Sequence, residues 1–166
     1  PNTLGRDSFA WYPVEFTAAG PLIDAEAAED SRLTLLRFID ELIATYAVDA
    51  QRVYLMGFSQ GAIMSLAVAL TQPEKAAGGV AMSGRLLPEL QPHIAAHLNG
   101  LPIFMAHGLR DLIIPISEAR AASQALARLA VQLTYREYDM GHQVTVESLN
   151  DIVAWLKQQL TMSNEQ

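Results

Sequence analysis

The sequence contains no cysteine and few basic residues, and each scarcity excludes a class of protein. Without cysteine the chain has no disulfide framework, no thiol nucleophile and no thiolate ligand for a metal; it suits a reducing compartment, so we expect a cytoplasmic protein. The 11 Lys and Arg are outnumbered by 18 Asp and Glu, for a net charge of −7. Because the basic residues form no stripe, nucleic acid and anionic membranes do not fit as partners. No apolar stretch approaches the length of a membrane span, which argues against integral membrane association.

The chain is instead rich in apolar residues. Hydrophobic residues make up 51% of its 166 residues, enough for a single domain with its own core. Short apolar runs typical of buried strands alternate with segments of helical period. The predicted strands cover residues 52–57, 79–84, 101–108 and 131–135, and the predicted helices cover 24–47, 60–70, 118–130 and 146–160. This alternation predicts an α/β domain over residues 1–166, with a mainly parallel sheet and helices on both faces.

Four local patterns carry finer expectations. The run 52–57 predicts a strand buried on both faces, and residues 1–20 predict irregular surface. Ser117 is predicted to cap the helix that follows it. The periodicity of the last helix predicts an inner face formed by Val146, Leu149, Ile152, Val153, Leu156 and Leu160.

The segment Gly57-Phe58-Ser59-Gln60-Gly61 has the form G-x-S-x-G and lies between a predicted strand and a predicted helix. In that context the pattern indicates a nucleophile elbow, a tight turn that presents the serine at the edge of the sheet. Both glycines are expected because side chains there would collide with the neighbouring strand and helix. The backbone N–H of Gln60, at the helix N-terminus, is the expected oxyanion donor. The alternative is a glycine-rich turn with a capping serine.

A serine nucleophile needs a base and an orienting acid, which in α/β-hydrolases follow it in that fold's order of Ser, Asp or Glu, His. Asp111 lies just after the strand that ends at Gly108, and His142 lies after the last strand. Each spacing leaves room for one strand-helix-strand passage back to the same edge. Asp139 is the rival acid, but it shares the loop of the histidine. His107 is the rival base, and we expect it to make a structural hydrogen bond in the acid loop.

His93 and His97 are four residues apart and could share a helix face as metal ligands. The residue after the first histidine is Ile94 rather than glutamate, and no third ligand is evident. We therefore expect solvated or capping histidines and no metal site.

These motifs together resemble the phospholipase/carboxylesterase family of α/β-hydrolases, which includes acyl-protein thioesterase-like enzymes. The resemblance rests on Trp11-Tyr12-Pro13, the elbow at residues 57–62, Met82-Ser83-Gly84, the loop from His107-Gly108 through Asp111 to Pro115, and Gly141-His142. It implies a serine hydrolase without cofactor, with Ser59 as nucleophile, His142 as base and then acid, Asp111 as its orienting partner and Gln60 as oxyanion donor. The implied substrate is a small ester or thioester, with Trp11, Leu86 and Ile113 lining the acyl site.

One departure concerns the N-terminal side. The family has earlier strands, followed by a His-Gly loop that supplies a second oxyanion N–H, and here the one His-Gly pair, His107-Gly108, belongs to the acid loop. We expect that the domain is incomplete at its N-terminal end, and that an uncovered central strand favours a homodimer. The expected function is a serine carboxylesterase for short- to medium-chain esters. The alternatives are a thioesterase or lysophospholipase of the same family, or a weakly catalytic domain that acts by interaction.

Overall fold

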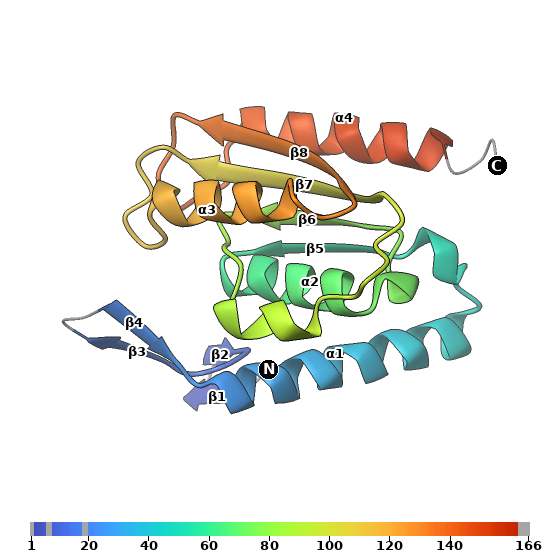
Figure 1. Cartoon of the computed structure of the whole chain (residues 1–166), viewed down its shortest axis with the longest axis horizontal. Coiled ribbons are helices and arrows are strands. Elements are labelled where there is room, and N and C mark those ends of the chain that lie inside the picture. The colour runs from blue at the N-terminus through green and yellow to red at the C-terminus, as the bar shows by residue number, and fades with distance from the viewer. Residues whose placement is uncertain (1, 6–7, 18–19, 163–166) are drawn as a thin grey trace.

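A four-stranded parallel sheet forms the centre of the structure, a computed structural model that describes residues 2–5, 8–17 and 20–162 (Figure 1). The strands are β5 (Tyr54–Phe58), β6 (Gly78–Met82), β7 (Leu101–Gly108) and β8 (Val131–Tyr138). They pair in chain order, each parallel to its neighbour. All four therefore end at the same edge, where the predicted chemistry-bearing loops follow.

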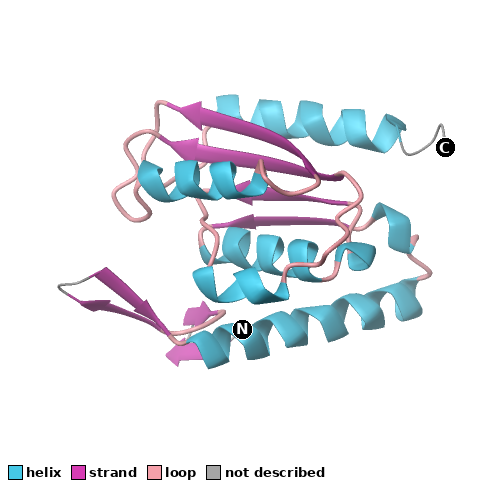
Figure 2. Cartoon of the chain, in the orientation of Figure 1, coloured by secondary structure: helices cyan, strands magenta, loops and turns pink. Residues whose placement is uncertain are grey.

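Four helices enclose the sheet, and the secondary-structure colouring of Figure 2 shows them on both sides. They are α1 (Ala25–Tyr46), α2 (Gln60–Thr71), α3 (Ile116–Leu126) and α4 (Val146–Met162). Short 3-10 turns cover η1 (Ala50–Arg52), η2 (Pro73–Lys75) and η3 (Pro88–His93). Among the described residues, no helix combines the length and the apolar character needed to cross a bilayer. The predicted α/β architecture is confirmed.

Alternation along the central strands explains the two layers. Ile103 and Met105 of β7 pack into a core with α2 and α3, whereas Phe104 and Ala106 pack into a second core with α4. A strand covered on both faces reads as a continuous apolar run, which is why β7 was predictable with its observed bounds. Helix α1 lies outside α2 and packs against it through a third apolar cluster.

Strand β5 departs from the expectation that it is buried on both faces. It is the edge strand of the described sheet, and Met56 and Phe58 are 57% and 37% exposed. The reason is the position of the core beneath α4. That core contains residues of β6, β7 and β8, but from β5 it contains only the partly buried Tyr54. The apolar run correctly predicted a strand but not its place at the edge.

The N-terminal stretch is not irregular, as was expected, but contains two antiparallel strand pairs. Strand β1 (Asn2–Gly5) pairs with β2 (Ser8–Ala10), and β3 (Val14–Thr17) pairs with β4 (Gly20–Ile23). Between them Tyr12 is buried in the cluster that joins α1 and α2. In Figure 1 the β3–β4 hairpin projects near the ends of the sheet strands. It thereby becomes a wall of the site described below.

Two helix starts differ in how they are stabilised. Asp24 caps α1, since its Oδ1 accepts a hydrogen bond of 2.9 Å from the N–H of Ala27. Pro115 occupies the N-cap position of α3, and Ser117, the expected cap, lies inside the first turn. Proline suits this boundary because its fixed φ and missing N–H cost nothing at a helix start.

Candidate active site

Ser59 lies in a sharp turn between the end of β5 and the start of α2. Its backbone φ is 55° and ψ is −120°, a conformation that non-glycine residues rarely adopt and that costs about 1–3 kcal/mol. Its N–H donates to the carbonyl oxygen of Met82 on the neighbouring strand at 2.9 Å, which holds the turn against the sheet. This backbone conformation projects the serine hydroxyl away from the edge of the sheet.

The two glycines of the elbow differ in their surroundings. A Cβ on Gly57 would lie 2.1 Å from the carbonyl carbon and oxygen of Gly61, so only glycine fits there. A Cβ on Gly61 would meet nothing within 4 Å. The expectation that both positions exclude side chains is therefore correct for Gly57 and wrong for Gly61.

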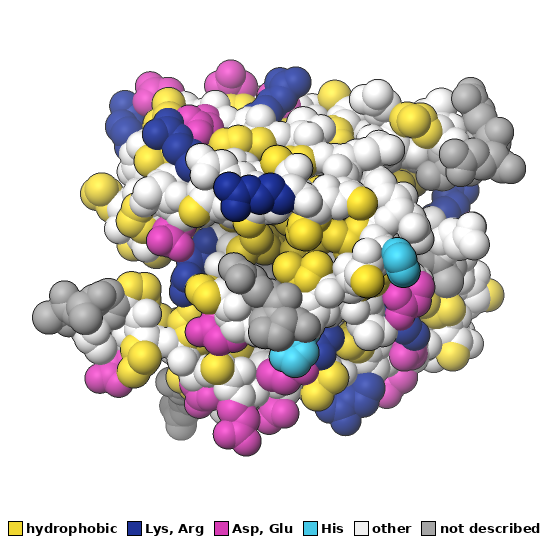
Figure 3. All heavy atoms as spheres, viewed as in Figure 1, with side chains coloured by type: hydrophobic (Ala, Val, Ile, Leu, Met, Phe, Trp, Pro, Cys, Tyr) yellow, Lys and Arg dark blue, Asp and Glu magenta, His cyan; other side chains and the backbone are white. Residues whose placement is uncertain are grey.

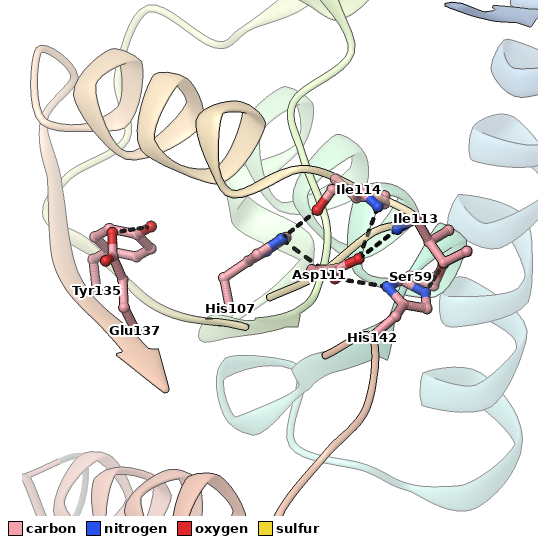
Figure 4. A network of polar contacts seen from close by, with 8 residues as sticks. All are labelled: Ser59, His107, Asp111, Ile113, Ile114, Tyr135, Glu137 and His142. Atoms are coloured by element: carbon pink, nitrogen blue, oxygen red, sulfur yellow. Dashed lines mark hydrogen bonds and ion pairs between the residues drawn. The ribbon is translucent and has the colours of Figure 1, made fainter. Parts of the chain in front are cut away.

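Three side chains from three loops form a continuous hydrogen-bonded chain at this edge (Figure 4). His142 Nε2 lies 3.0 Å from Ser59 Oγ, and His142 Nδ1 lies 2.7 Å from Asp111 Oδ2. With a proton on Nδ1, the imidazole donates to the carboxylate and presents the lone pair of Nε2 to the serine hydroxyl. The ring of Phe58 packs on His142 with a centroid distance of 4.7 Å. The arrangement is suited to removing a proton from Ser59.

Asp111 is fixed by its own loop. Its Oδ1 accepts hydrogen bonds of 2.9 Å from the N–H groups of Ile113 and Ile114, and the residue is 5% exposed. Burial, the largest single influence, raises the pKa of Asp111, but the hydrogen bonds from His142 and from these two amides together hold that pKa below its usual value. The carboxyl group is therefore ionised at neutral pH and supports an imidazolium.

Neither rival residue takes the place of Asp111 or His142. His107 is buried and its Nε2 lies 2.8 Å from the carbonyl oxygen of Ile114, so Nε2 carries a proton and donates it; the predicted structural hydrogen bond is confirmed. The same Nε2 lies 3.4 Å from Asp111 Oδ2, so His107 also supports the acid (Figure 4). Asp139 is exposed and pairs with Arg110 at 3.0 Å. That contact joins the acid and base loops at the surface.

A cavity of about 760 Å³ opens beside Ser59. In the space-filling view a hollow separates the projecting β3–β4 hairpin from the body of the molecule (Figure 3). The lining is largely apolar and includes Trp11 and Ile113, two of the three residues expected there. Leu86 is absent from the described lining and packs against the core of α2 and α3, while its neighbour Arg85 lines the cavity.

The side chain of Gln60 has a role that the sequence did not indicate. Its Oε1 accepts from the N–H of Trp11 at 3.0 Å, and its Nε2 donates to the carbonyl oxygen of Tyr12 at 2.9 Å. Ser31 Oγ also donates to the carbonyl oxygen of Trp11. The backbone N–H of Gln60 belongs to the first turn of α2, where helical geometry provides no acceptor. One residue thus holds the cavity wall and offers an N–H to an anion.

The histidine pair considered as metal ligands does not share a helix face. His93 ends the short turn η3, His97 lies beyond it, and both are exposed. Within the described ranges, no three His, Asp or Glu side chains are grouped to hold a metal ion.

Comparison with known proteins agrees with the fold. A model of the family described as Phospholipase/Carboxylesterase matches residues 2–160. Acyl-protein thioesterase 1 of Kluyveromyces lactis is 32% identical over 95% of this chain and 72% of its own length, and a probable carboxylesterase SOBER1-like of Arabidopsis thaliana is 30% identical over 76% and 49%. The crystal structure of esterase PE8 has a TM-score of 0.78 at 26% identity, covering 90% of this chain and 70% of that one. The chain spans between 48% and 72% of the length of such curated relatives.

Proposed function

The chain belongs to the phospholipase/carboxylesterase family, and from that premise we propose that it is a serine carboxylesterase acting on short- to medium-chain esters. The observation that carries the proposal is the hydrogen-bonded chain from Asp111 through His142 to Ser59, at 2.7 and 3.0 Å. It lies at the edge of an apolar cavity large enough for an acyl chain.

The first half of the reaction acylates the serine. Ser59 Oγ attacks the carbonyl carbon of the ester while His142 Nε2 takes the hydroxyl proton, and Asp111 stabilises the resulting imidazolium. The negative oxygen of the tetrahedral intermediate accepts a hydrogen bond from the N–H of Gln60, aided by the positive end of α2. The bond to the leaving alcohol then breaks as His142 returns its proton to the alkoxide oxygen.

The second half releases the acid. Water gives a proton to His142 and attacks the acyl-enzyme carbonyl, and collapse of the second intermediate frees the carboxylic acid as Ser59 Oγ regains its proton. No cofactor enters either half. The largely apolar cavity wall lies beside the reacting carbonyl, and apolar surroundings strengthen the electrostatic interactions there.

A thioesterase is the second candidate because acyl-protein thioesterases are among the relatives with 30% identity or more. The triad chemistry is common to both leaving groups. Turnover of a butanoyl oxygen ester and a butanoyl thioester with otherwise identical leaving groups separates them, since a thioesterase has the larger kcat/KM for the thioester after correction for its faster spontaneous hydrolysis.

Replacement of the nucleophile tests the proposal. Ser59→Ala should reduce kcat for ester hydrolysis by about 10⁶-fold and abolish covalent labelling by a fluorophosphonate probe. Ser83→Ala is a matched control because Ser83 is also a serine at positive φ, one strand away, and it should retain both properties. Hydrolysis by Ser59→Ala at the parent rate, or an unlabelled parent protein, would favour a domain that acts by interaction.

A further inference from the structure

The cavity beside Ser59 contains one charged side chain among its described lining residues. That side chain is Arg85, and the remainder of the lining is apolar or neutral. The chain as a whole is acidic, with a net charge of −7, yet the described wall of this cavity has a cation and no carboxylate. The sign of the charge in the cavity is therefore opposite to that of the protein.

The backbone brings Arg85 to the nucleophile. Ser59 donates its N–H to Met82 at the end of β6, and Arg85 follows three residues later. Between them the chain crosses the first turn of α2 so closely that a Cβ on Gly84 would lie 2.6 Å from the Cβ of Ala62. Arg85 is thus held at the start of the helix that begins at the elbow, where the bound ester must lie.

The ion pair of Arg85 is a loose one. Its Nη1 lies 3.5 Å from Glu118 Oε2, beyond the usual length of a charge-assisted hydrogen bond. The Glu118 side chain is 46% exposed on the first turn of α3, whereas the Arg85 side chain is only 17% exposed. A weakly paired guanidinium with little exposure retains most of its five N–H donors for another anion.

The charge of Arg85 also acts on the inner wall of the cavity. Burial raises the pKa of Tyr12 to about 12; the positive charge of Arg85 opposes that rise, and the negative charge of Glu89 adds to it. Arg85 lines the same cavity as Tyr12, whose carbonyl oxygen accepts from the side chain of Gln60, and as Ser59. An anion beside Arg85 would therefore lie in the same cavity as the reacting ester.

Resting on the proposed function, we infer that Arg85 determines specificity by binding an anionic group of the ester substrate, a carboxylate or a phosphate, beside the scissile carbonyl. The planar guanidinium can take two oxygens of either group in parallel hydrogen bonds. The apolar wall holds the carbon chain between the anion and the ester. The inferred substrates are thus esters that carry a negative charge at one end.

Matched substrates test this inference. Monomethyl glutarate and methyl pentanoate have acyl chains of equal length that end in a carboxylate and a methyl group, and butanoylglycerol phosphate and butanoylglycerol form the corresponding pair for phosphate. Acid release is followed by pH-stat titration. One charge-assisted pair predicts that kcat/KM for one anionic substrate exceeds that of its neutral match by about 10- to 100-fold. The pair that shows the larger ratio identifies the anion.

Three variants assign the preference to Arg85. Arg85→Met should reduce the ratio of anionic to neutral kcat/KM to about one. Arg85→Lys should retain part of the ratio, since lysine keeps the positive charge but cannot bind two oxygens in parallel as the guanidinium does. Glu118→Gln removes the loose partner and should leave the ratio at or above the parent value. Equal rates for anionic and neutral esters in the parent, or an unchanged ratio in Arg85→Met, would overturn the inference.

Binding separates this inference from the proposed catalysis. Calorimetry of Ser59→Ala with monomethyl glutarate should show affinity that Arg85→Met in the same background reduces by about tenfold or more. If this binding is observed but the parent protein hydrolyses none of the esters, the esterase is refuted and the anion site is kept. Ester hydrolysis without Arg85-dependent binding or preference would keep the esterase and refute the anion site.

Discussion

Replacement of Asp111 by asparagine should eliminate the base function of His142 without removing the imidazole. The carboxylate uses its two oxygens differently, since Oδ1 accepts from the amides of Ile113 and Ile114 and Oδ2 accepts from His142. The side-chain amide of asparagine has a single oxygen, which can face either His142 or the two backbone amides but not both. If that oxygen faces His142, its NH₂ group faces two part-buried N–H donors and both backbone hydrogen bonds are lost.

The free-energy cost of that orientation sets the size of the effect. Two part-buried donors without acceptors cost about 1–2 kcal/mol each, or about 2–4 kcal/mol together. The amide therefore keeps its oxygen toward the backbone and its NH₂ group toward His142, which must then place its proton on Nε2, facing Ser59. The basic tautomer returns only when the amide turns its oxygen toward His142, so about 2–4 kcal/mol corresponds to a loss of roughly 30- to 10³-fold in kcat.

Initial rates with p-nitrophenyl butyrate measure this loss, and circular dichroism melts establish that the variant is folded at the assay temperature. Asp139→Asn is the matched control, because Asp139 is exposed on the loop of His142 and pairs with Arg110. It should retain activity within about twofold, as surface ion pairs contribute little. An Asp111→Asn enzyme within tenfold of the parent, or a larger loss in Asp139→Asn, would refute the assignment.

Two further outcomes follow from the same structure. Gly57→Ala should lower stability by about 3 kcal/mol or more because its Cβ overlaps backbone, whereas Gly61→Ala should not lower the melting temperature; equal melting temperatures would contradict the elbow geometry. A hydrogen bond from Arg120 is the main cause that lowers the pKa of Glu137 to about 2, so its stabilisation is present above pH 4.5 and is lost as pH falls toward 2. Glu137→Gln should therefore melt below the parent at pH 7 and together with it near pH 2, and a constant difference would exclude this linkage.

Local patterns predicted the elements that are local or fully enclosed. Helix α2 begins at Gln60 and β7 covers residues 101–108 as expected, because helical period and continuous apolar runs are properties of neighbouring residues. The two N-terminal hairpins were not predicted, since their strands are only three or four residues long and show no sustained alternation. Their place beside the sheet depends on Tyr12 being buried against α2, a contact between distant parts of the chain.

The last helix illustrates the same division. Its period was predicted, and Ile152 and Leu156 of the predicted inner face do lie in the core. Val146, Leu149 and Val153 are exposed instead, and Ser148 and Trp155, which were not predicted, are buried. Trp155 packs edge-on against Phe104 of β7, with ring centroids 5.7 Å apart. The identity of the residue that faces the core was decided by the shape of the sheet beneath it.

By itself the sequence determined the α/β class and identified Ser59, Asp111 and His142 as residues to be found at one edge, because residue type, order and spacing are written along the chain. Only the tertiary structure decided that hydrogen bonds of 2.7 and 3.0 Å join them. It also decided that the side chain of Gln60 holds the cavity wall and that Arg85, rather than Leu86, lines the cavity. These facts depend on where loops from separate strands meet, and that meeting is set by packing between residues far apart in the sequence.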